Sequence, residues 1–294
     1  MREFNGTEFT EERALFGSEC LAVNGCAFDI GESPLKECRN ISVNGSIFKG
    51  KYPLWYCSGI DVSGSTFYEG ARAGIWYTSN ISIIGSEIIA PKCFRRAEYI
   101  SLTGVKFTNA AETFWNCRKI KLDYVYAKGD YFAMNSSDIE AAGLTVEGNY
   151  AFDSVKNLVI RNSKLVTKDA FWNSENVTVY DSYISGEYLA WNSKNVTFIN
   201  CTIDSLQGLC YIENLKLVNC KLQSTNLAFE YSSVEADVSG TIKSVFNPLS
   251  GRIKADCISE LIIDSGRIDP EMTEIVCEKV EKHSDRPDWK EELA

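Results

Sequence analysis

The sequence is poor in the residues from which metal sites and disulfide frameworks are usually built. It contains one histidine, His283, close to the C-terminal end, and no Cys-x-x-Cys motif. A zinc site normally needs several histidine or cysteine ligands at short spacing, so none is expected. No apolar run reaches the roughly 18 residues of a membrane span. We therefore expect a soluble protein with no metal and no cofactor.

The sequence also has fewer basic than acidic residues. Thirty lysines and arginines face 40 aspartates and glutamates, which gives a formal net charge of −10. An acidic chain is repelled by nucleic acids and by anionic membrane surfaces, so neither is an expected partner. The first residues contain acidic side chains and no apolar core of a signal peptide, which predicts a cytoplasmic location.

What the chain does have is a repeat. An isoleucine, leucine or valine, called the anchor here, recurs about every 19 residues over most of the chain. The anchors are Leu21, Ile41, Ile60, Ile81, Ile100, Ile120, Ile139, Leu158, Val177, Val196, Leu215, Val234 and Ile253. Such a constant step indicates a solenoid, in which one structural unit stacks repeatedly.

The residues around each anchor predict short strands joined by corners. The position two after the anchor is again apolar, as in Val43 and Val179, and this period of two is typical of a strand. Asparagine, glycine and aspartate follow, as in Asn44-Gly45, and they tolerate the backbone of a corner. Two more apolar clusters in each repeat predict a second and a third short strand.

Asparagine is frequent at the position just before the anchor, for example Asn157, Asn176 and Asn195. Turns of a solenoid stack about 4.8 Å apart, so identical asparagines can form a hydrogen-bonded ladder. The fold class predicted is therefore all-β: a right-handed parallel β-helix solenoid of about twelve turns of 19–21 residues, capped at both ends. The right hand is preferred because parallel crossovers are nearly always right-handed.

Three segments are expected along the chain. Residues 1–16 are predicted to form an N-terminal cap, residues 17–266 the β-helix, and residues 267–294 a C-terminal cap or tail. Within the last segment, 271–282 is a candidate short helix, and Trp289 a residue that pins it. The 11 cysteines fall mostly in repeat positions shared with Ser, Ala or Thr. Such positions demand small volume, which predicts reduced, buried thiols.

Aromatic residues recur on the long side of each turn. Five of the six tryptophans lie five residues before the anchor, and several tyrosines lie eight before it. An exposed stripe of this kind suits a carbohydrate chain, whereas a buried one only fills the core, and the sequence leaves both open. The candidate ligand-binding residues are Trp55, Trp76, Trp115, Tyr131, Tyr150, Trp172, Tyr188, Trp191 and Lys92.

Charged residues interleave with this stripe and supply candidate catalytic groups. Glu112 and Asp130 should lie one turn apart, and Asp169 and Glu187 form a second such pair, as glycoside hydrolases require. Arg72 and Arg95 could neutralise a uronate in a polysaccharide lyase. Exposed charges on a solenoid flank are also the ordinary case, so catalysis itself stays open.

Several segments of the repeat resemble a known group of proteins: ERALFGSE (12–19), GESPLKEC (31–38), KYPLWYC (51–57), ARAGIWYT (71–78), GDYFAMNS (129–136), the stretch 169–196, and LQGLCYIENL (206–215). By these segments the chain is similar to an uncharacterised family of bacterial β-helix proteins within the pectin-lyase-like superfamily. The resemblance implies the fold but brings no mechanism.

The motifs of better-known β-helix enzymes are missing. Polygalacturonases are recognised by Asn-Thr-Asp, Asp-Asp, Gly-His-Gly and Arg-Ile-Lys, of which only Arg252-Ile253-Lys254 is present. Calcium-dependent pectate lyases cluster aspartates in adjacent turns, but Asp130 and Asp169 should lie two turns apart. Two functions remain: binding or processing of an oligosaccharide along the aromatic flank, or a non-catalytic scaffold that binds a protein or self-associates there.

Overall fold

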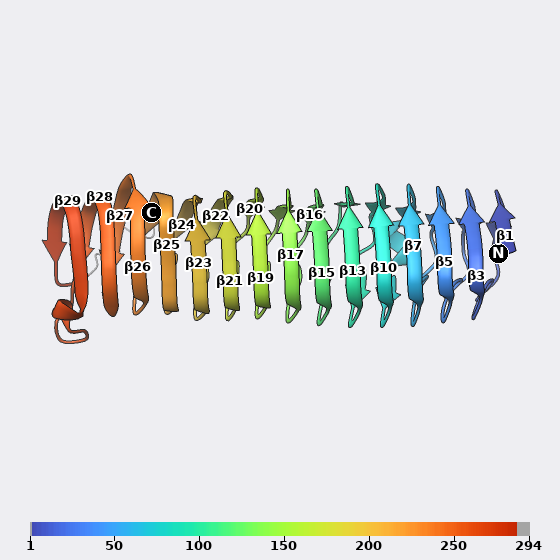
Figure 1. The fold of residues 1–294 in the computed structure, drawn as a ribbon, viewed down its shortest axis with the longest axis horizontal. Helices are drawn as coiled ribbons and strands as arrows, with labels where there is room; N and C mark the ends of the chain where they lie inside the picture. Colours follow the sequence, from blue (N-terminus) through green and yellow to red (C-terminus); the bar gives the residue numbers. More distant parts are fainter. Residues whose placement is uncertain (1, 287–294) are drawn as a thin grey trace. The chain divides into compact units, whose positions relative to one another are not determined.

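The structure is a computed structural model, and it describes residues 2–286. The chain divides into two compact units, Met1–Gly148 and Asn149–Ala294. Each unit is a parallel β-solenoid whose coil is right-handed (Figure 1). The predicted fold class is confirmed.

The first unit has one long strand and one short strand in each turn. Its long strands are β1 (Arg2–Asn5), β3 (Glu19–Asn24), β5 (Arg39–Asn44), β7 (Ser58–Ser63), β10 (Ser79–Ile84), β13 (Glu98–Thr103), β15 (Arg118–Asp123) and β17 (Ser137–Ala142). Its short strands are β2 (Glu8–Phe9), β4 (Ala27–Phe28), β6 (Ile47–Phe48), β8 (Thr66–Phe67), β11 (Glu87–Ile88), β14 (Lys106–Phe107), β16 (Tyr126–Lys128) and β18 (Thr145–Glu147). The unit also contains the short strands β9 (Ile75–Trp76) and β12 (Phe94–Arg95) and the 3₁₀ turn η1 (Glu69–Ala71).

The second unit continues with the same alternation until its last turns. Its long strands are β19 (Lys156–Arg161), β21 (Glu175–Tyr180), β23 (Lys194–Ile199), β25 (Glu213–Asn226), β26 (Ser233–Ser239), β28 (Ser250–Ile262) and β29 (Thr273–Ser284). The others are β20 (Lys164–Val166), β22 (Tyr183–Glu187), β24 (Thr202–Leu206), β27 (Thr241–Phe246) and the 3₁₀ turn η2 (Pro270–Met272).

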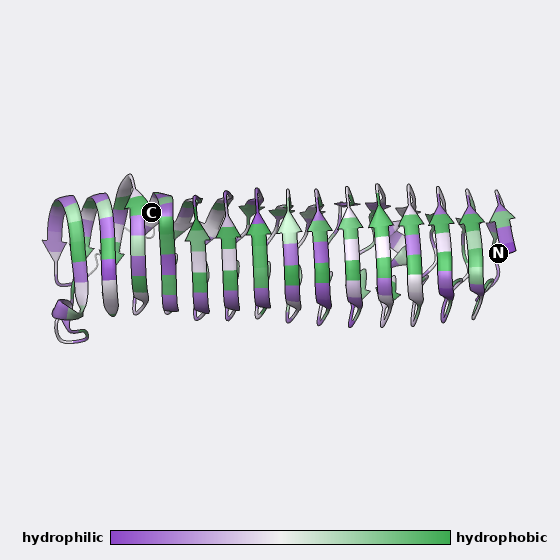
Figure 2. Ribbon diagram, viewed as in Figure 1, coloured by the Kyte–Doolittle hydropathy of each residue, from purple (hydrophilic) through white to green (hydrophobic). Residues whose placement is uncertain are grey.

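The predicted repeat sets the register of the pairing. Ile41 pairs with Ile60 in one unit, and Val177 pairs with Val196 in the other. Apolar side chains at alternate positions point inward, so green and purple bands alternate along the long strands (Figure 2). The pattern slips near the end, because Val234 pairs with Gly251 and Ile253 pairs with Ala236. The step there is 17 residues, and Ile253 is not the register partner of the preceding anchor.

The number of turns is larger than predicted. Residues 2–148 contain eight long strands and residues 149–286 contain seven, against about twelve turns expected. The difference arises at the ends. Arg2 pairs with Leu21 in β3, and Ile275 of β29 pairs with Ile253 in β28. Both segments therefore extend the ladder, and whether these terminal turns also act as caps stays a prediction.

The C-terminal segment corrects one expectation. Residues 273–284 form the strand β29 and not the short helix predicted for 271–282. Thr273, Ile275 and Cys277, at alternate positions, give the segment a strand period, and pairing with β28 satisfies its backbone. Trp289, expected to pin the helix, lies outside the described residues.

The third side of each turn is mostly not a strand. In residues 2–286 it forms paired strands only at β9 and β12. Elsewhere alternate residues adopt left-handed backbone conformations, as at Tyr131, Ala133 and Asn135, with φ of 58°, 64° and 54°. This zigzag curls the chain and prevents an extended strand.

Asparagine ladders appear as predicted, most completely in the second unit. Asn195 Nδ2 donates to Asn176 Oδ1 at 2.9 Å, and Asn176 Nδ2 donates to Asn157 Oδ1 at 3.1 Å. Each asparagine has a left-handed backbone, which this residue tolerates better than most. In the first unit the equivalent column is interrupted by Gly59, Tyr99 and Lys119.

The cysteines behave as small core residues. All 11 are free, and eight are buried. Burial raises the pKa of Cys38 to about 11 and that of Cys57 to about 12, so these thiols are unreactive near neutral pH. Within residues 2–286, no helix has the length and apolar character that crossing a membrane requires.

Candidate functional site

The tryptophan stripe lies at the surface and not in the core. The neighbouring position, six before the anchor, carries the buried side chains, and Phe94, Phe114 and Phe171 are all 0% exposed. The tryptophans one residue later are half-buried. The stripe therefore lies at the edge of the core and is partly accessible to solvent.

In the first unit the stripe forms a closed stack, which we call the N-terminal column: Tyr52, Trp55, Trp76, Arg95 and Trp115. The rings of Trp55 and Trp76 are stacked at 5.2 Å with an interplanar angle of 8°. The guanidinium of Arg95 then lies between Trp76 and Trp115, 4.6 Å and 4.8 Å from their ring centroids. Both faces of Trp76 are thus covered from within the protein.

The polar groups of this column are also engaged. The indole N–H of Trp76 donates to the carbonyl of Lys92 at 2.9 Å, and that of Trp115 donates to the carbonyl of Tyr131 at 2.8 Å. Glu112 accepts ion pairs from Lys92 at 2.9 Å and from Arg95 at 3.4 Å. Glu112 therefore balances the cation of the stack.

The other predicted residues of the first unit lie on the neighbouring turns. Asp130 is one turn from Glu112, where its carbonyl accepts the Glu112 N–H at 2.9 Å, and its side chain is exposed. Tyr131 is 37% exposed and meets Trp115 edge to face. Arg72 is exposed beside η1. The carboxyl pair predicted here is thus an ion-paired glutamate beside an exposed aspartate.

The second unit arranges its rings differently, in a group that we call the C-terminal cluster: Trp172, Tyr188, Trp191, Tyr211 and Tyr231. Trp191 contacts Trp172 at 66°, Tyr188 at 74° and Tyr211 at 62°, with centroids 5.2–5.9 Å apart. No two of these rings cover one another face to face. Tyr150, also predicted for this stripe, is half-buried at the start of the unit.

Two predicted carboxylates border the C-terminal cluster in contrasting environments. Asp169 is 2% exposed, and its Oδ2 has no hydrogen-bond partner. Burial raises the pKa of Asp169 above its ordinary value. Glu187, one turn on, is half-buried and accepts an ion pair from Lys168 at 2.9 Å. The sequence correctly put these groups in adjacent turns but gave no sign that one would be buried.

Two residues of the C-terminal cluster were missed from the sequence. Tyr211 and Tyr231 lie four and three residues before their anchors, outside the two stripes considered. Tyr211 hydrogen-bonds to Glu230, and burial together with that carboxylate raises the pKa of Tyr211 to about 12. The tyrosines Tyr56 and Tyr77, also four before their anchors, could have revealed this third aromatic stripe.

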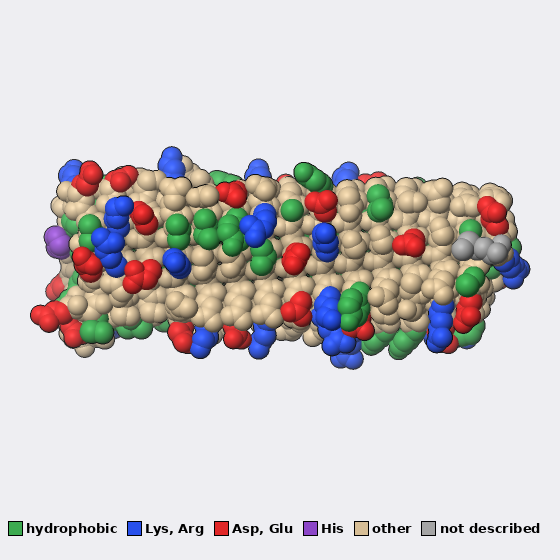
Figure 3. Space-filling view, in the orientation of Figure 1, with side chains coloured by type: hydrophobic (Ala, Val, Ile, Leu, Met, Phe, Trp, Pro, Cys, Tyr) green, Lys and Arg blue, Asp and Glu red, His purple; other side chains and the backbone are tan. Residues whose placement is uncertain are grey.

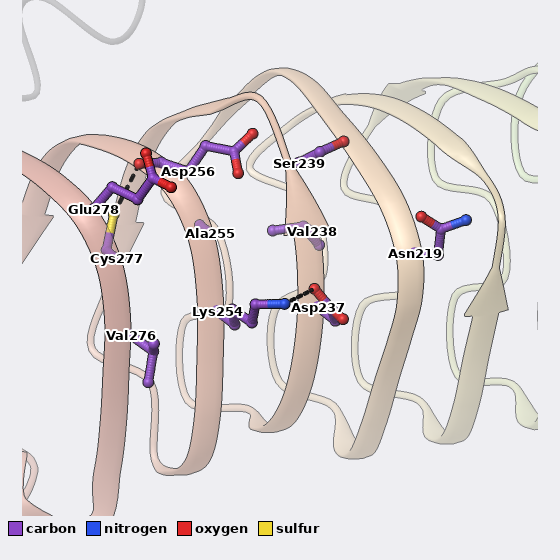
Figure 4. A pocket seen from close by; sticks show the side chains of 10 residues that line it. All are labelled: Asn219, Asp237, Val238, Ser239, Lys254, Ala255, Asp256, Val276, Cys277 and Glu278. Carbon is purple, nitrogen blue, oxygen red and sulfur yellow. Dashed lines mark hydrogen bonds and ion pairs between the residues drawn. The ribbon is translucent and has the colours of Figure 1, made fainter.

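One surface pocket is lined by none of these rings, and another is lined by Tyr56 and Tyr77. The first, of about 410 Å³, is formed by strands β25, β26, β28 and β29 (Figure 4). Lys254 pairs there with Asp237 at 3.2 Å, and Asp256 accepts the Gly240 N–H at 2.8 Å. The other, of about 390 Å³, lies on β5, β7 and β10. Acidic and basic side chains are interspersed over the face shown in Figure 3.

The structure offers no ready metal site. No group of three or more His, Cys, Asp or Glu side chains in residues 2–286 converges closely enough to hold a metal ion. The C-terminal cluster presents inclined aromatic rings, with carboxylates at its border.

Comparison with protein families gives one match. The profile of a family described as "Protein of unknown function (DUF3737)" matches residues 2–276. A search of curated proteins finds no significant match.

Solved structures with a similar chain path are distant. A mutant tailspike protein of E. coli bacteriophage HK620, in complex with a pentasaccharide, has 10% sequence identity and a TM-score of 0.43 over 95% of this chain and 72% of its own. The A-module of the Azotobacter vinelandii mannuronan C-5 epimerase AlgE4 has 9% identity and a TM-score of 0.29, covering 97% of this chain and 87% of that one. Neither similarity carries functional weight at these values.

Proposed function

We propose, from the premise that the chain belongs to the DUF3737 family of β-solenoid proteins, that it binds an oligosaccharide on the C-terminal cluster. The observation that supports this most is the inclined packing of the rings around Trp191, at 62° to 74°. Inclined rings leave part of their faces uncovered by one another, and the apolar face of a pyranose can pack against such a surface.

The polar groups at the border of the cluster complement the hydroxyls of a sugar. Glu187 accepts hydrogen bonds, and Lys168, paired with it at 2.9 Å, donates them. Tyr211 is 39% exposed and provides a ring edge beside Trp191. A ligand lying across Trp191 would therefore meet both an apolar surface and a charged pair.

Two carboxyl groups at the border of the cluster suggest which reaction could accompany binding. Asp169 and Glu187 are the carboxyl groups best suited to hydrolysis, because they lie in adjacent turns and differ in environment: burial raises the pKa of Asp169, whereas Glu187 pairs with Lys168 at 2.9 Å. Asp169 has too little exposure to touch a ligand unless the covering side chains move. Binding is therefore the function proposed, and turnover is what product analysis would add.

Tryptophan fluorescence during titration with neutral and uronate-containing oligosaccharides tests the proposal. We expect a quench or blue shift that disappears in Tyr188→Ala, which removes a ring next to Trp191. Tyr124→Ala is the matched control, because Tyr124 is 73% exposed and lies outside both aromatic groups. A response equal in both variants, or no response across the panel, would refute carbohydrate binding here.

A scaffold that binds a protein is the alternative, and the N-terminal column favours it. There the rings and Arg95 satisfy one another, so the column stiffens successive turns and exposes only edges. Reduced, buried cysteines fit a cytoplasmic location for either function. Capture of a protein partner that depends on the N-terminal column, together with no fluorescence response to any sugar, would support the scaffold function.

A further inference from the structure

A pocket of about 390 Å³ on the first unit is lined by hydrogen-bond donors and contains a cation without a counter-ion. Arg39, Ser58 and Ser79 follow one another in register on β5, β7 and β10. Tyr56 and Tyr77 form an adjoining wall. A cavity of this size accommodates a small molecule or the end of a larger one.

The sequence makes the hollow by placing small residues where other turns have large ones. At the column position of Arg39, the next two turns have Ser58 and Ser79, whereas later turns have Glu98 and Arg118. Beside them Gly59 interrupts the asparagine column. A Cβ built on Gly59 would come within 2.6 Å of Asn40 Oδ1, so the Asn40 amide, which lines the pocket, occupies the space that a side chain at position 59 would need.

Arg39 is the charged group of this hollow. Within residues 2–286 no carboxylate lies within ion-pair distance of its guanidinium, whereas Arg118 in the same column pairs with Glu98 at 2.5 Å. Glu19 occupies the register position one turn before Arg39, on the side away from Ser58, and makes no ion pair with it. Arg39 is thus a fork of N–H donors at the edge of a cavity.

The remaining lining adds donors and positive potential. Ser79 Oγ donates to Ser58 Oγ at 3.2 Å, which leaves the Ser58 hydroxyl hydrogen for another acceptor. The rings of Tyr56 and Tyr77, which line the pocket, are stacked with centroids 4.8 Å apart. Lys36 and Arg96 lie over the outer faces of these rings, 5.7 Å and 6.0 Å from the centroids.

We propose that this pocket binds an oxyanion, a carboxylate or a phosphate carried on a small molecule, with Arg39 as its main contact. A planar guanidinium matches two oxygens of either group at once, and the Ser58 hydroxyl reaches a third acceptor. The pocket lies in the first unit and the C-terminal cluster in the second, so oxyanion binding and carbohydrate binding can each fail alone.

Isothermal titration calorimetry with three anionic probes and one neutral probe tests the proposal. The probes are inorganic phosphate, glucose 6-phosphate, glucuronate and, as the neutral control, glucose. We expect saturable binding of at least one oxyanion and none of glucose. Preference for glucuronate would identify a sugar carboxylate as the ligand group, and preference for the two phosphates would identify a phosphate. Failure of all three anions to saturate would overturn the proposal.

Three variants assign the binding to this pocket. Arg39→Gln replaces the guanidinium with a shorter, uncharged amide, and should weaken binding about tenfold or more. Gly59→Asn introduces a residue that tolerates the φ of 70° at this position, displaces the Asn40 amide that lines the pocket, and should weaken binding similarly. Arg118→Gln removes a cation already paired in the same column and should change affinity less than about twofold. Equal losses in Arg39→Gln and Arg118→Gln, or none in Arg39→Gln, would contradict the assignment.

Discussion

The two units build the same solenoid but complete their aromatic stripes in opposite ways. In the N-terminal column the indoles of Trp55 and Trp76 lie parallel, and Arg95 occupies the next position of the stack. In the C-terminal cluster the rings around Trp191 are inclined by 62° to 74°. The same residue type at the same repeat position can therefore stabilise the fold in one unit and offer a surface in the other.

Truncating the central tryptophan of each group should show this contrast most strongly. Trp76→Ala loses a parallel ring contact, a cation–π contact and an indole hydrogen bond, and should lower the free energy of unfolding by about 2–3 kcal/mol. Trp191→Ala loses an indole hydrogen bond to the Gln207 carbonyl and inclined ring contacts, but no parallel ring contact and no cation–π contact, and should cost about 1–2 kcal/mol. Chemical denaturation measures both. A larger cost for Trp191→Ala would invert the assignment of roles.

Arg95 provides the next test, because it links two indoles and an acid. Arg95→Gln removes the cation between Trp76 and Trp115 and leaves Glu112 with Lys92 alone, which should cost about 1–2 kcal/mol in denaturation. Lys106→Gln breaks an exposed ion pair with Glu87 in the same unit and should cost less than about 0.5 kcal/mol. Equal losses of unfolding free energy in the two variants would mean that the contacts of Arg95 with the indoles add no more stability than an exposed ion pair.

Asp169 predicts a pH effect confined to the second unit. Burial holds the pKa of Asp169 above its ordinary value, so the folded chain binds this proton more tightly than the unfolded chain does. Its contribution to stability is complete below about pH 4 and declines as the pH rises through the folded pKa. Asp169→Asn should therefore stabilise the protein by up to about 1 kcal/mol at pH 7 and less at pH 3.

Thermal or urea denaturation of Asp169→Asn at both pH values measures that difference. Asp61→Asn, at an exposed position of the first unit, is the control and should change stability equally little at each pH. Stabilisation by Asp169→Asn that is greater at pH 3 than at pH 7 would argue against a buried, proton-binding carboxyl.

The smallest expected difference separates the asparagine columns. Asn176 and Asn80 have similar left-handed backbones, with φ of 59° and 55°, so replacement by alanine strains both equally. Only Asn176 exchanges side-chain hydrogen bonds with neighbours on both sides. Asn176→Ala should therefore cost about 0.5–1 kcal/mol more than Asn80→Ala. Equal unfolding midpoints would show that the ladder contributes nothing net.

The sequence was sufficient for the fold because the repeat is a local signal reinforced at every turn. The anchors and the apolar residues two positions later predict strands, and the register bears this out from Ile41 to Leu215 within the respective units. It was insufficient at the ends: Arg2–Asn5 keeps the 19-residue step but has Arg2 in place of an apolar anchor, and Thr273–Ser284 joins the ladder after a step of 22 residues. A single sequence offers no repeat against which such terminal turns can be aligned.

The site was harder to predict for a geometric reason. On the third side of the turn the backbone alternates into left-handed conformations, so strand alternation could not say which of two adjacent aromatics points inward. The burial of Asp169 likewise depends on its packing and not on its position in the repeat, since the equivalent Lys92 is exposed. Ring tilt in the C-terminal cluster depends on contacts that no periodicity encodes.

Because equivalent positions of successive turns pair in register, one whole turn is the unit by which this chain can change its length in evolution. Duplicating one whole turn of 19 residues would bring each new side chain above its counterpart, as Val196 stands above Val177, and the inward and outward columns would both continue. Inserting a single residue would turn the inward-facing side chains outward and the outward-facing side chains inward. Such a chain can lengthen or shorten by turns at little cost in folding, so new surface can be copied before it is altered.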